Sequence, residues 1–264
     1  MIYTKTDIIN QLKQMNAPTD RIVLMHSSLR SIGPVERGAQ GLLDTLVDYF
    51  TRNGGLFCVP THTWHNLDKD ITLDMASSNN CLGAFSTVAL EDGRGVRSES
   101  PTHSMVVFGD RSKAENFIKD EPSIITPTAP ESCYGKIDFV LLAGVAQNRN
   151  TYLHCVDEML RIPNRMEEKT SPMTIRRKSG QVVKRDIALF YTDYIEDISD
   201  RFIKYDTAFR YHRCIVDGFV GNAPTQLCDT KKMKDTIALL WQNSDGADPL
   251  FSENPIPQSW YCTK

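Results

Sequence analysis

His154 is followed by two carboxylic acids at helical spacing, Asp157 at i+3 and Glu158 at i+4, in the segment NTYLHCVDE. If residues 151–162 form a helix, both acids lie near the face that carries the imidazole. A carboxylate there can fix the ring tautomer and stabilise the imidazolium, as a general base requires. A solvated histidine–acid pair on a helix surface has the same spacing, so spacing alone leaves both interpretations open.

The position of this segment favours the catalytic interpretation. The apolar run DFVLLAGV at 138–145 indicates a buried strand, and the predicted helix starts just after its carboxyl end, where open α/β sheets bind their ligands. Cys155 adjoins His154, but neighbouring residues on a helix point about 100° apart. We therefore interpret Cys155 as a buried packing residue rather than a nucleophile.

Three other polar segments are candidates for chemistry. The loop HSSLRSIGPVERGAQ at 26–40 could offer backbone N–H groups to a phosphate at a helix N-terminus, although it spells no known glycine motif and an ordinary loop fits its spacing better. His62 and His65 in THTWH could share a metal ion, but no third ligand is evident, so we predict no metal. His103 in SPTHS is, by itself, typical of a hydrogen-bonded loop histidine.

The elements around these residues alternate between strand and helix in the first half of the chain, as in an α/β protein. Residues 68–104 contain few long apolar runs, and we expect them to wrap over the sheet as an active-site excursion with one helix near 83–91. Strands are predicted at 21–26, 56–60, 105–109 and 138–145, with helices at 3–16, 41–55, 110–120 and 151–162. The second half is predicted to contain a hairpin at 171–191, a helix at 194–209, a hairpin at 212–229 and a helix at 230–243.

The composition excludes several classes of protein. A net charge of −3 gives no basic surface to attract nucleic acid, and 41% hydrophobic residues are ordinary for a globular chain of 264 residues. The seven cysteines show no paired spacing, which favours reduced thiols over disulfides or structural zinc. No apolar run approaches the roughly 20 residues of a spanning helix. We expect one cytoplasmic domain over residues 1–264, monomeric or homodimeric, with the part from about 164 appended to the same body and with no nucleic-acid or membrane partner.

Six segments occur in an order that is specific to one family. They are HSSLRSIGPVERGA, CVPTHTW, RSESPTHS, SCYGKI, LLAGVAQNRNTYLHCVDE and GFVGNA. Together they resemble the aminoglycoside N3-acetyltransferases, and in particular bacterial relatives of unassigned acceptor. The resemblance covers most of the chain and implies an α/β fold distinct from the GNAT acetyltransferases, with a central mixed sheet covered by helices on both faces. It also implies acetyl-CoA as the donor, an amine acceptor such as the 3-amino group of an aminoglycoside, and a link to antibiotic resistance.

The resemblance assigns roles to individual residues. The histidine of its Asn-Thr-x-Leu-His pattern is the base, which corresponds to His154, and we expect direct transfer with Asp157 first and Glu158 second as its acid. Backbone N–H groups or the hydroxyl of Thr151 are expected to hold the oxyanion. The residues implied for acetyl-CoA binding are His26, Ser27, Ser28, Ser31, Ile32, Gly33, Val35, Gly38, Arg97, Ser98, Thr102, His103 and Ser104.

The chain also departs from the family pattern. Ser100 and Pro101 stand where the family has His-Pro, and Thr87 aligns with a family glutamate. The acid that replaces this glutamate is expected to be Asp157, Glu158 or Glu91. These departures motivate an alternative function, a CoA-binding module of this fold with lost or altered transfer chemistry. A metal-dependent hydrolase that uses THTWH is a weaker third hypothesis.

Overall fold

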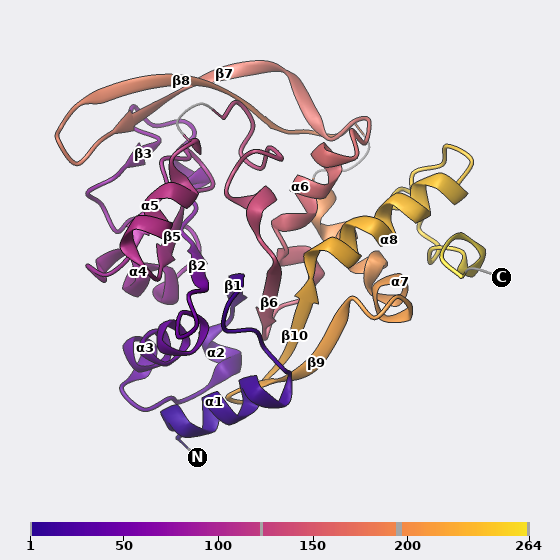
Figure 1. Ribbon diagram of the computed structural model, residues 1–264. Coiled ribbons are helices and arrows are strands. Elements are labelled where there is room, and N and C mark those ends of the chain that lie inside the picture. Colours follow the sequence, from indigo (N-terminus) through magenta and orange to yellow (C-terminus); the bar gives the residue numbers. More distant parts are fainter. Residues whose placement is uncertain (1, 122–123, 194–196, 263–264) are drawn as a thin grey trace.

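The computed structural model describes residues 2–121, 124–193 and 197–262 (Figure 1). Its main feature is a seven-stranded mixed sheet in the order β4-β5-β2-β1-β6-β10-β9. The strands are β1 (Ile22–Ser27), β2 (Leu56–Pro60), β4 (Val96–Arg97), β5 (Met105–Phe108), β6 (Phe139–Ala143), β9 (Ile215–Val220) and β10 (Ala223–Asp229). β2, β1 and β6 run parallel, whereas β5 and β10 are antiparallel to their neighbours. β9 and β10, the last two strands of the described chain, thus belong to the central sheet.

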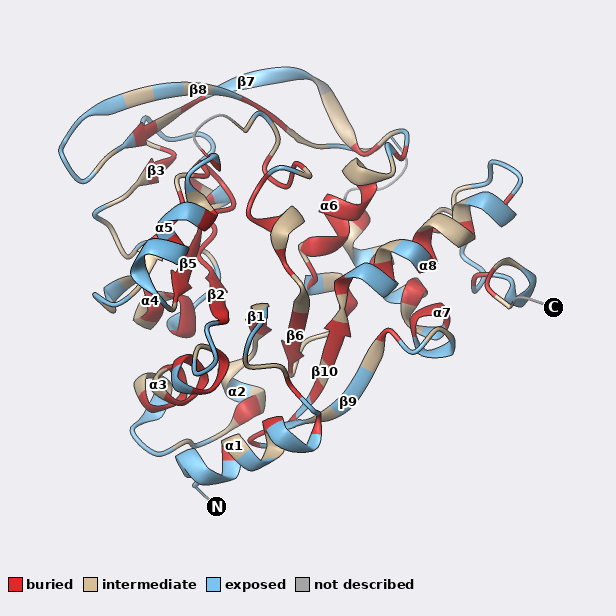
Figure 2. Cartoon of the chain, in the orientation of Figure 1, coloured by how far each residue is buried: buried red, intermediate tan, exposed pale blue. Residues whose placement is uncertain are grey.

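The parallel strands are apolar because helices cover both faces of the sheet. Along β6, Val140 and Leu142 pack on one face while Leu141 and Ala143 pack on the other, as the twofold period of a strand requires. One face carries α1 (Lys5–Gln14), α3 (Gly38–Phe50) and α4 (Ala84–Glu91), and the other carries α5 (Arg111–Ile118), α6 (Tyr152–Met159), α7 (Asp206–Tyr211) and α8 (Thr230–Asn243). Figure 2 shows the central strands almost wholly buried. The predicted α/β fold with a mixed sheet between helices is confirmed.

The strand order creates a crevice at one edge of the sheet. From β1 the chain passes through α3 to β2 on one side, while β6 pairs with β1 on the other side. Connections that diverge from one strand leave a gap at its carboxyl end, and open α/β sheets bind ligands there. The ends of β1, β2 and β6 thus mark the expected position of the site.

A second sheet lies across the top of the molecule in Figure 1. It is built from β7 (Met166–Arg176) and β8 (Val182–Phe190), with β3 (Leu73–Asp74) parallel to β7. Glu99 binds Arg177 of the turn (2.8 Å) and Arg185 of β8, so the hairpin is tied to the segment before β5. The predicted hairpin at 171–191 is present, and it begins earlier, at Met166.

Some boundaries differ from the sequence predictions. The loop predicted at 26–40 contains a short helix, α2 (Leu29–Ile32), because the Ser28 side chain caps the backbone N–H of Ser31. The helix predicted at 194–209 is a 3₁₀ helix (Ile198–Tyr205) followed by α7, and residues 194–196 lie outside the described residues. Of the helices in the described ranges, none has both the length and the apolar character to cross a membrane.

Candidate active site

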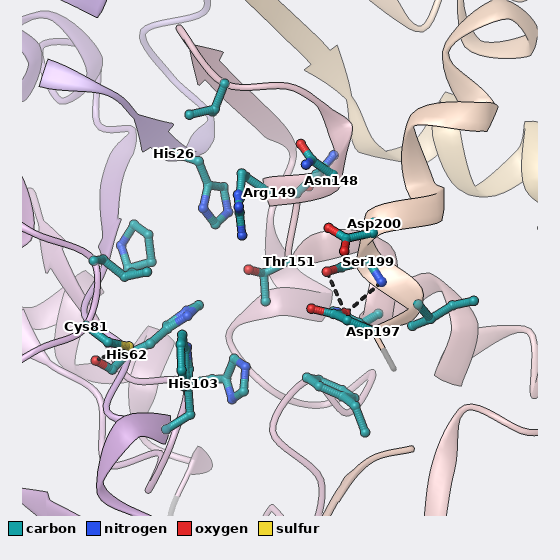
Figure 3. Close-up of a pocket in the computed structure, with 18 of the residues that line it drawn as sticks. His26, His62, Cys81, His103, Asn148, Arg149, Thr151, Asp197, Ser199 and Asp200 are labelled. Carbon is teal, nitrogen blue, oxygen red and sulfur yellow. Dashed lines mark hydrogen bonds between the residues drawn. The ribbon is translucent and has the colours of Figure 1, made fainter. Parts of the chain in front are cut away.

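A cleft of about 1070 Å³ opens at the carboxyl ends of β1, β2 and β6. His26 at the end of β1 and His62 just after β2 line one side (Figure 3). Thr151 and His154 reach the cleft from the start of α6, which follows β6 as the sequence predicted. Phe190, the last residue of β8, brings the second sheet over the same cleft. The fold thus collects side chains from these four segments at the expected edge.

The His154 imidazole is held by aromatic rings. It is 9% exposed and stacks on Phe190 with ring centroids 3.9 Å apart and planes 10° from parallel, while Phe202 meets it edge-on at 4.9 Å. Burial lowers the pKa of His154 to about 4, Asp197 opposes this shift, and Arg165 adds to it. The ring is therefore neutral near pH 7 and can accept a proton.

Asp157, the acid predicted to orient His154, faces a different partner. It is buried beside Arg165, whose Nε lies 3.2 Å from the Asp157 Oδ2 atom, and Arg165 also binds Asp248 at 2.6 Å. Burial raises the pKa of Asp157, and Arg165 only partly offsets this. No hydrogen bond joins Asp157 to His154 in the described part of the chain. Helical spacing placed the acid near the histidine in sequence, but its carboxylate forms an ion pair with the arginine of the next segment.

Glu158 also binds residues other than His154. Its carboxylate accepts hydrogen bonds from Thr126 and from Thr128, the latter at 2.7 Å. Burial raises the pKa of Glu158. Glu91, the third predicted substitute, is exposed on α4. Among the residues that line the cleft, neither Glu158 nor Glu91 is found.

The acids that do line the cleft are Asp197 and Asp200, at the start of the 3₁₀ helix (Figure 3). Asp197 accepts hydrogen bonds from the backbone N–H of Ser199 (2.9 Å) and from its hydroxyl (2.6 Å), which fix the carboxylate. Its charge favours the protonated form of His154. Sequence reasoning missed both acids. The only signal was the pair of aspartates in DISD before an amphipathic segment, and such a pattern equally fits a helix cap.

The cleft holds three further histidines. The Nε2 atom of His62 lies 2.7 Å from the hydroxyl of Tyr134, and its ring centroid is 4.5 Å from that of His103. His103 Nδ1 is 2.8 Å from the hydroxyl of Thr102, and the Nε2 atom of His26 is buried with no hydrogen-bond partner among the described residues. Burial lowers the pKa of His26 to about 4 and that of His103 to about 3. All these rings are neutral near pH 7.

The first predicted acetyl-CoA segment, residues 26–38, divides into two parts. His26 and Ser27 line the cleft. Ser28 and Ser31 hydrogen-bond to each other (3.0 Å) at α2. The remaining predicted residues, Ile32, Gly33, Val35 and Gly38, are not among the cleft-lining residues.

This second part of the loop packs on the turn between β9 and β10, which explains the late motif GFVGNA. The backbone N–H of Asn222 donates to the carbonyl of Ile32 at 2.9 Å. Gly33 has a φ of +77°, and a Cβ atom there would meet the Asn222 side chain at 2.6 Å. We infer that these residues shape the loop, and that His26 and Ser27 are its cleft-facing members.

The second predicted segment, residues 97–104, forms a buried support for the histidines. Arg97 donates to the carbonyls of Asp74 (3.0 Å) and Ser77 (2.9 Å) and to the hydroxyl of Ser104 (3.2 Å). The hydroxyl of Ser98 accepts from the backbone N–H of residue 105 at 3.0 Å. Within this segment only His103 lines the cleft. Thr102 binds its ring, so the segment positions His103.

The described residues contain no group of three or more His, Cys, Asp and Glu side chains arranged to hold a metal ion. His62 faces the cleft, whereas His65 does not line it. The two histidines of THTWH therefore do not act together at this site.

Comparisons with known proteins agree on one class, the acyltransferases of α/β fold. A sequence profile of the aminoglycoside 3-N-acetyltransferase family matches residues 24–241, so the chain belongs to that family. Aminoglycoside N(3)-acetyltransferase IV from Salmonella is 27% identical over 261 residues, covering 96% of this chain and 91% of the relative. The SPbeta prophage-derived aminoglycoside N(3')-acetyltransferase-like protein YokD of Bacillus subtilis (strain 168) is 22% identical, covering 92% and 93%.

Solved structures agree with this assignment. A histidine-to-alanine mutant of aminoglycoside acetyltransferase AAC(3)-IVa in complex with a gentamicin superimposes with a TM-score of 0.77 at 26% identity, covering 94% of this chain and 93% of that one. AAC-IIIb in its binary complex with CoASH shares the fold, with a TM-score of 0.77 at 18% identity, covering 92% and 97%. The chain is thus an acetyl-CoA-dependent acyltransferase with the antibiotic N-acetyltransferase fold rather than the GNAT fold, as predicted.

Proposed function

We propose that this enzyme transfers the acetyl group of acetyl-CoA to an amine of a polycationic acceptor, with His154 as the general base. The observation that carries the proposal is the His154 ring itself. It is neutral, held by Phe190 and Phe202, and lies in the same cleft as the carboxylates of Asp197 and Asp200. A base that accepts no hydrogen bond from the described residues and shares its cleft with two carboxylates suits an amine substrate.

The low pKa of His154 is compatible with this role. As the bond between the amine nitrogen and the acetyl carbon forms, the nitrogen becomes strongly acidic, so a weak base can remove its proton. The positive charge that then appears on His154 is stabilised by Asp197, whose negative charge raises the pKa of the ring. We assign the stabilising carboxylate to Asp197 rather than to Asp157, because Asp157 is paired with Arg165.

The acceptor we propose is an aminoglycoside, acetylated at its 3-amino group. AAC(3)-IVa, a structural relative, has been solved with a gentamicin and with apramycin. Asp197 and Asp200 give this cleft the negative wall that such a polycation requires. The acetyl-CoA arm is proposed to lie along His26, Ser27 and His103, and Thr151 remains a candidate donor to the oxyanion.

The test is an acceptor screen with the purified chain. Acetyl-CoA is incubated with gentamicin, apramycin, uncharged amino sugars and simple alkylamines, and acetylated products are read by mass spectrometry, because seven cysteines would disturb thiol reagents. We expect acetylation of the aminoglycosides at the 3-amino group. Acetyl-CoA binding without transfer to any amine would support the CoA-binding module instead.

A further inference from the structure

His62 lies on the opposite side of the cleft from Asp197, next to Cys81 and His103 (Figure 3). Its side chain is only 4% exposed, so its orientation is set by the protein. Its backbone carbonyl accepts from the N–H of Cys81 at 2.9 Å, which fixes the chain at this point. The protein thus holds the His62 imidazole in a fixed orientation in the same cleft as His154.

The hydrogen bond to Tyr134 determines which nitrogen of His62 carries the proton. Tyr134 is fully buried, and burial raises the pKa of its phenol well above 10, so the phenol keeps its proton. Its hydroxyl lies 2.7 Å from His62 Nε2 but 3.4 Å from the carbonyl of His103, which exceeds an ordinary O–H···O distance. The shorter contact favours donation by the phenol to Nε2, and with that direction the neutral ring carries its proton on Nδ1.

The Nδ1 atom of His62 is available to a ligand. It has no hydrogen-bond partner among the described residues. It is also not one of their fully buried polar atoms that lack a partner, so it remains accessible from the cleft. Burial and the neighbouring histidines hold the pKa of His62 well below its usual value, so the ring offers one neutral N–H donor at working pH. Other groups are less suited, since the amide of Asn150 already donates to Gln147 at 2.9 Å and Thr151, the N-cap of α6, is only three residues before the base.

We propose that His62 is a catalytic residue whose Nδ1–H donates to the acetyl carbonyl oxygen of acetyl-CoA, and that Tyr134 is the positioning residue that fixes this tautomer. The inference rests on the proposed acetyl transfer and adds a role that the sequence motifs did not assign. A preorganised donor aimed at the oxygen where charge develops stabilises the transition state more than the substrate.

The reaction sequence balances without any further reactant. The amine lone pair attacks the carbonyl carbon, the π electrons of the C=O bond move onto the oxygen facing His62, and His154 takes the proton from the nitrogen. The C=O bond then re-forms as the C–S bond breaks, and the sulfur of CoA leaves with the proton from His154. His62 remains neutral throughout, and the products are the amide and free CoA.

The test compares His62→Ala, His62→Asn and Tyr134→Phe with the wild type, using acetyl-CoA and the best acceptor from the screen. The Asn amide places an N–H near the position of Nδ1, so it should restore part of the lost rate. We expect His62→Ala to lower kcat about 100-fold at every pH tested, with the Kd for acetyl-CoA nearly unchanged, and His62→Asn to recover about tenfold of this. Tyr134→Phe should lower kcat about tenfold, since the tautomer is no longer fixed.

Two controls separate the possible outcomes. Tyr152→Phe removes a similar buried hydroxyl, one that donates to the carbonyl of Thr230 at 3.2 Å outside the cleft, and should keep wild-type kcat. ¹⁵N NMR of His62 should show the proton on Nδ1 in the wild type and a changed tautomer in Tyr134→Phe, whatever the activity. A proton on Nε2 in the wild type, or wild-type kcat in His62→Ala, would overturn the role of His62 alone. A wild type that acetylates no amine would overturn the proposed function and the role of His62 with it.

Discussion

The imidazole of His154 lies face to face with the ring of Phe190, with centroids 3.9 Å apart and planes 10° from parallel. Phe190 is the last residue of β8, so a strand from the second half of the chain shields the proposed base from water and packs against one face of its ring. The His154 ring thus packs on an aromatic side chain, where a hydrogen-bonded carboxylate was predicted.

Replacing Phe190 should change the protonation of His154. In Phe190→Leu, water reaches the ring, so the pKa of His154 should rise from about 4 toward its usual 6.5. NMR titration of the His154 ring measures this directly, and Phe190→Tyr, which keeps the stacked ring, is the matched control. An unchanged pKa in the leucine variant would show that the stack does not control the base.

Asp197 and Asp157 can be separated by parallel amide substitutions. Asp197→Asn removes the charge that stabilises protonated His154 and should lower kcat about 10- to 100-fold. Asp157→Asn, beside Arg165, should leave kcat within about threefold of wild type. Steady-state kinetics with both variants decides the assignment, and the reverse order of effects would restore Asp157 as the acid that serves the base.

Acid should destabilise the fold through its buried histidines. The pKa values of His26 and His154 are lowered to about 4 and that of His103 to about 3, whereas the unfolded chain binds these protons near 6.5. The unfolded state therefore binds more protons below pH 6.5, so the stability is fully present above that pH and is lost as the pH falls toward about 4.

Urea denaturation across this range should show the free energy of unfolding falling by several kcal/mol, and His154→Gln should show a shallower fall. A flat profile between these pH values would mean that the rings protonate freely in the folded state.

The buried cation Arg165 should matter for stability more than for catalysis. Arg165→Ala would leave Asp157 and Asp248 buried without their partner, at a cost of about 3–5 kcal/mol in the free energy of unfolding. Arg165 lowers the pKa of Asp157 against the effect of burial, so its loss should raise that pKa further. At Asp157 the folded variant then binds more protons than the unfolded chain, so the free energy of unfolding of the variant falls as the pH rises.

The destabilisation by Arg165→Ala should accordingly be larger at about pH 8 than at about pH 5 in chemical denaturation. Adding Asp157→Asn and Asp248→Asn should recover part of the loss at the higher pH. A loss that is equal at both pH values would argue against buried ionised carboxylates as its cause.

Much of the fold could be predicted because it depends on local patterns. The apolar runs at β1, β2 and β6 and the helical period after residue 151 are enough to place His154 at the carboxyl edge of the sheet. The partners of His154 could not be predicted in this way. Phe190 and Asp197 are brought to the cleft by the second sheet and the segment after it, and no local pattern in the sequence links either residue to His154.

The structure gives some of these residues partners that spacing did not indicate. Helical spacing put Asp157 beside His154, but Arg165 binds its carboxylate. Proximity in sequence suggested His62 and His65 as a pair, whereas His62 faces the cleft through its bond to Tyr134, which lies 72 positions further along the chain. Sequence spacing predicts which face of an element a residue occupies, and tertiary contacts decide its partner.

The most direct measurement is the turnover of His154→Gln with acetyl-CoA and gentamicin, alongside calorimetry of acetyl-CoA binding. Glutamine keeps the polarity of the side chain but cannot accept a proton. If His154 is the base, kcat should fall about 10³-fold while the Kd for acetyl-CoA stays near the wild-type value. A variant that acetylates gentamicin within about threefold of the wild-type rate would contradict the assignment of His154.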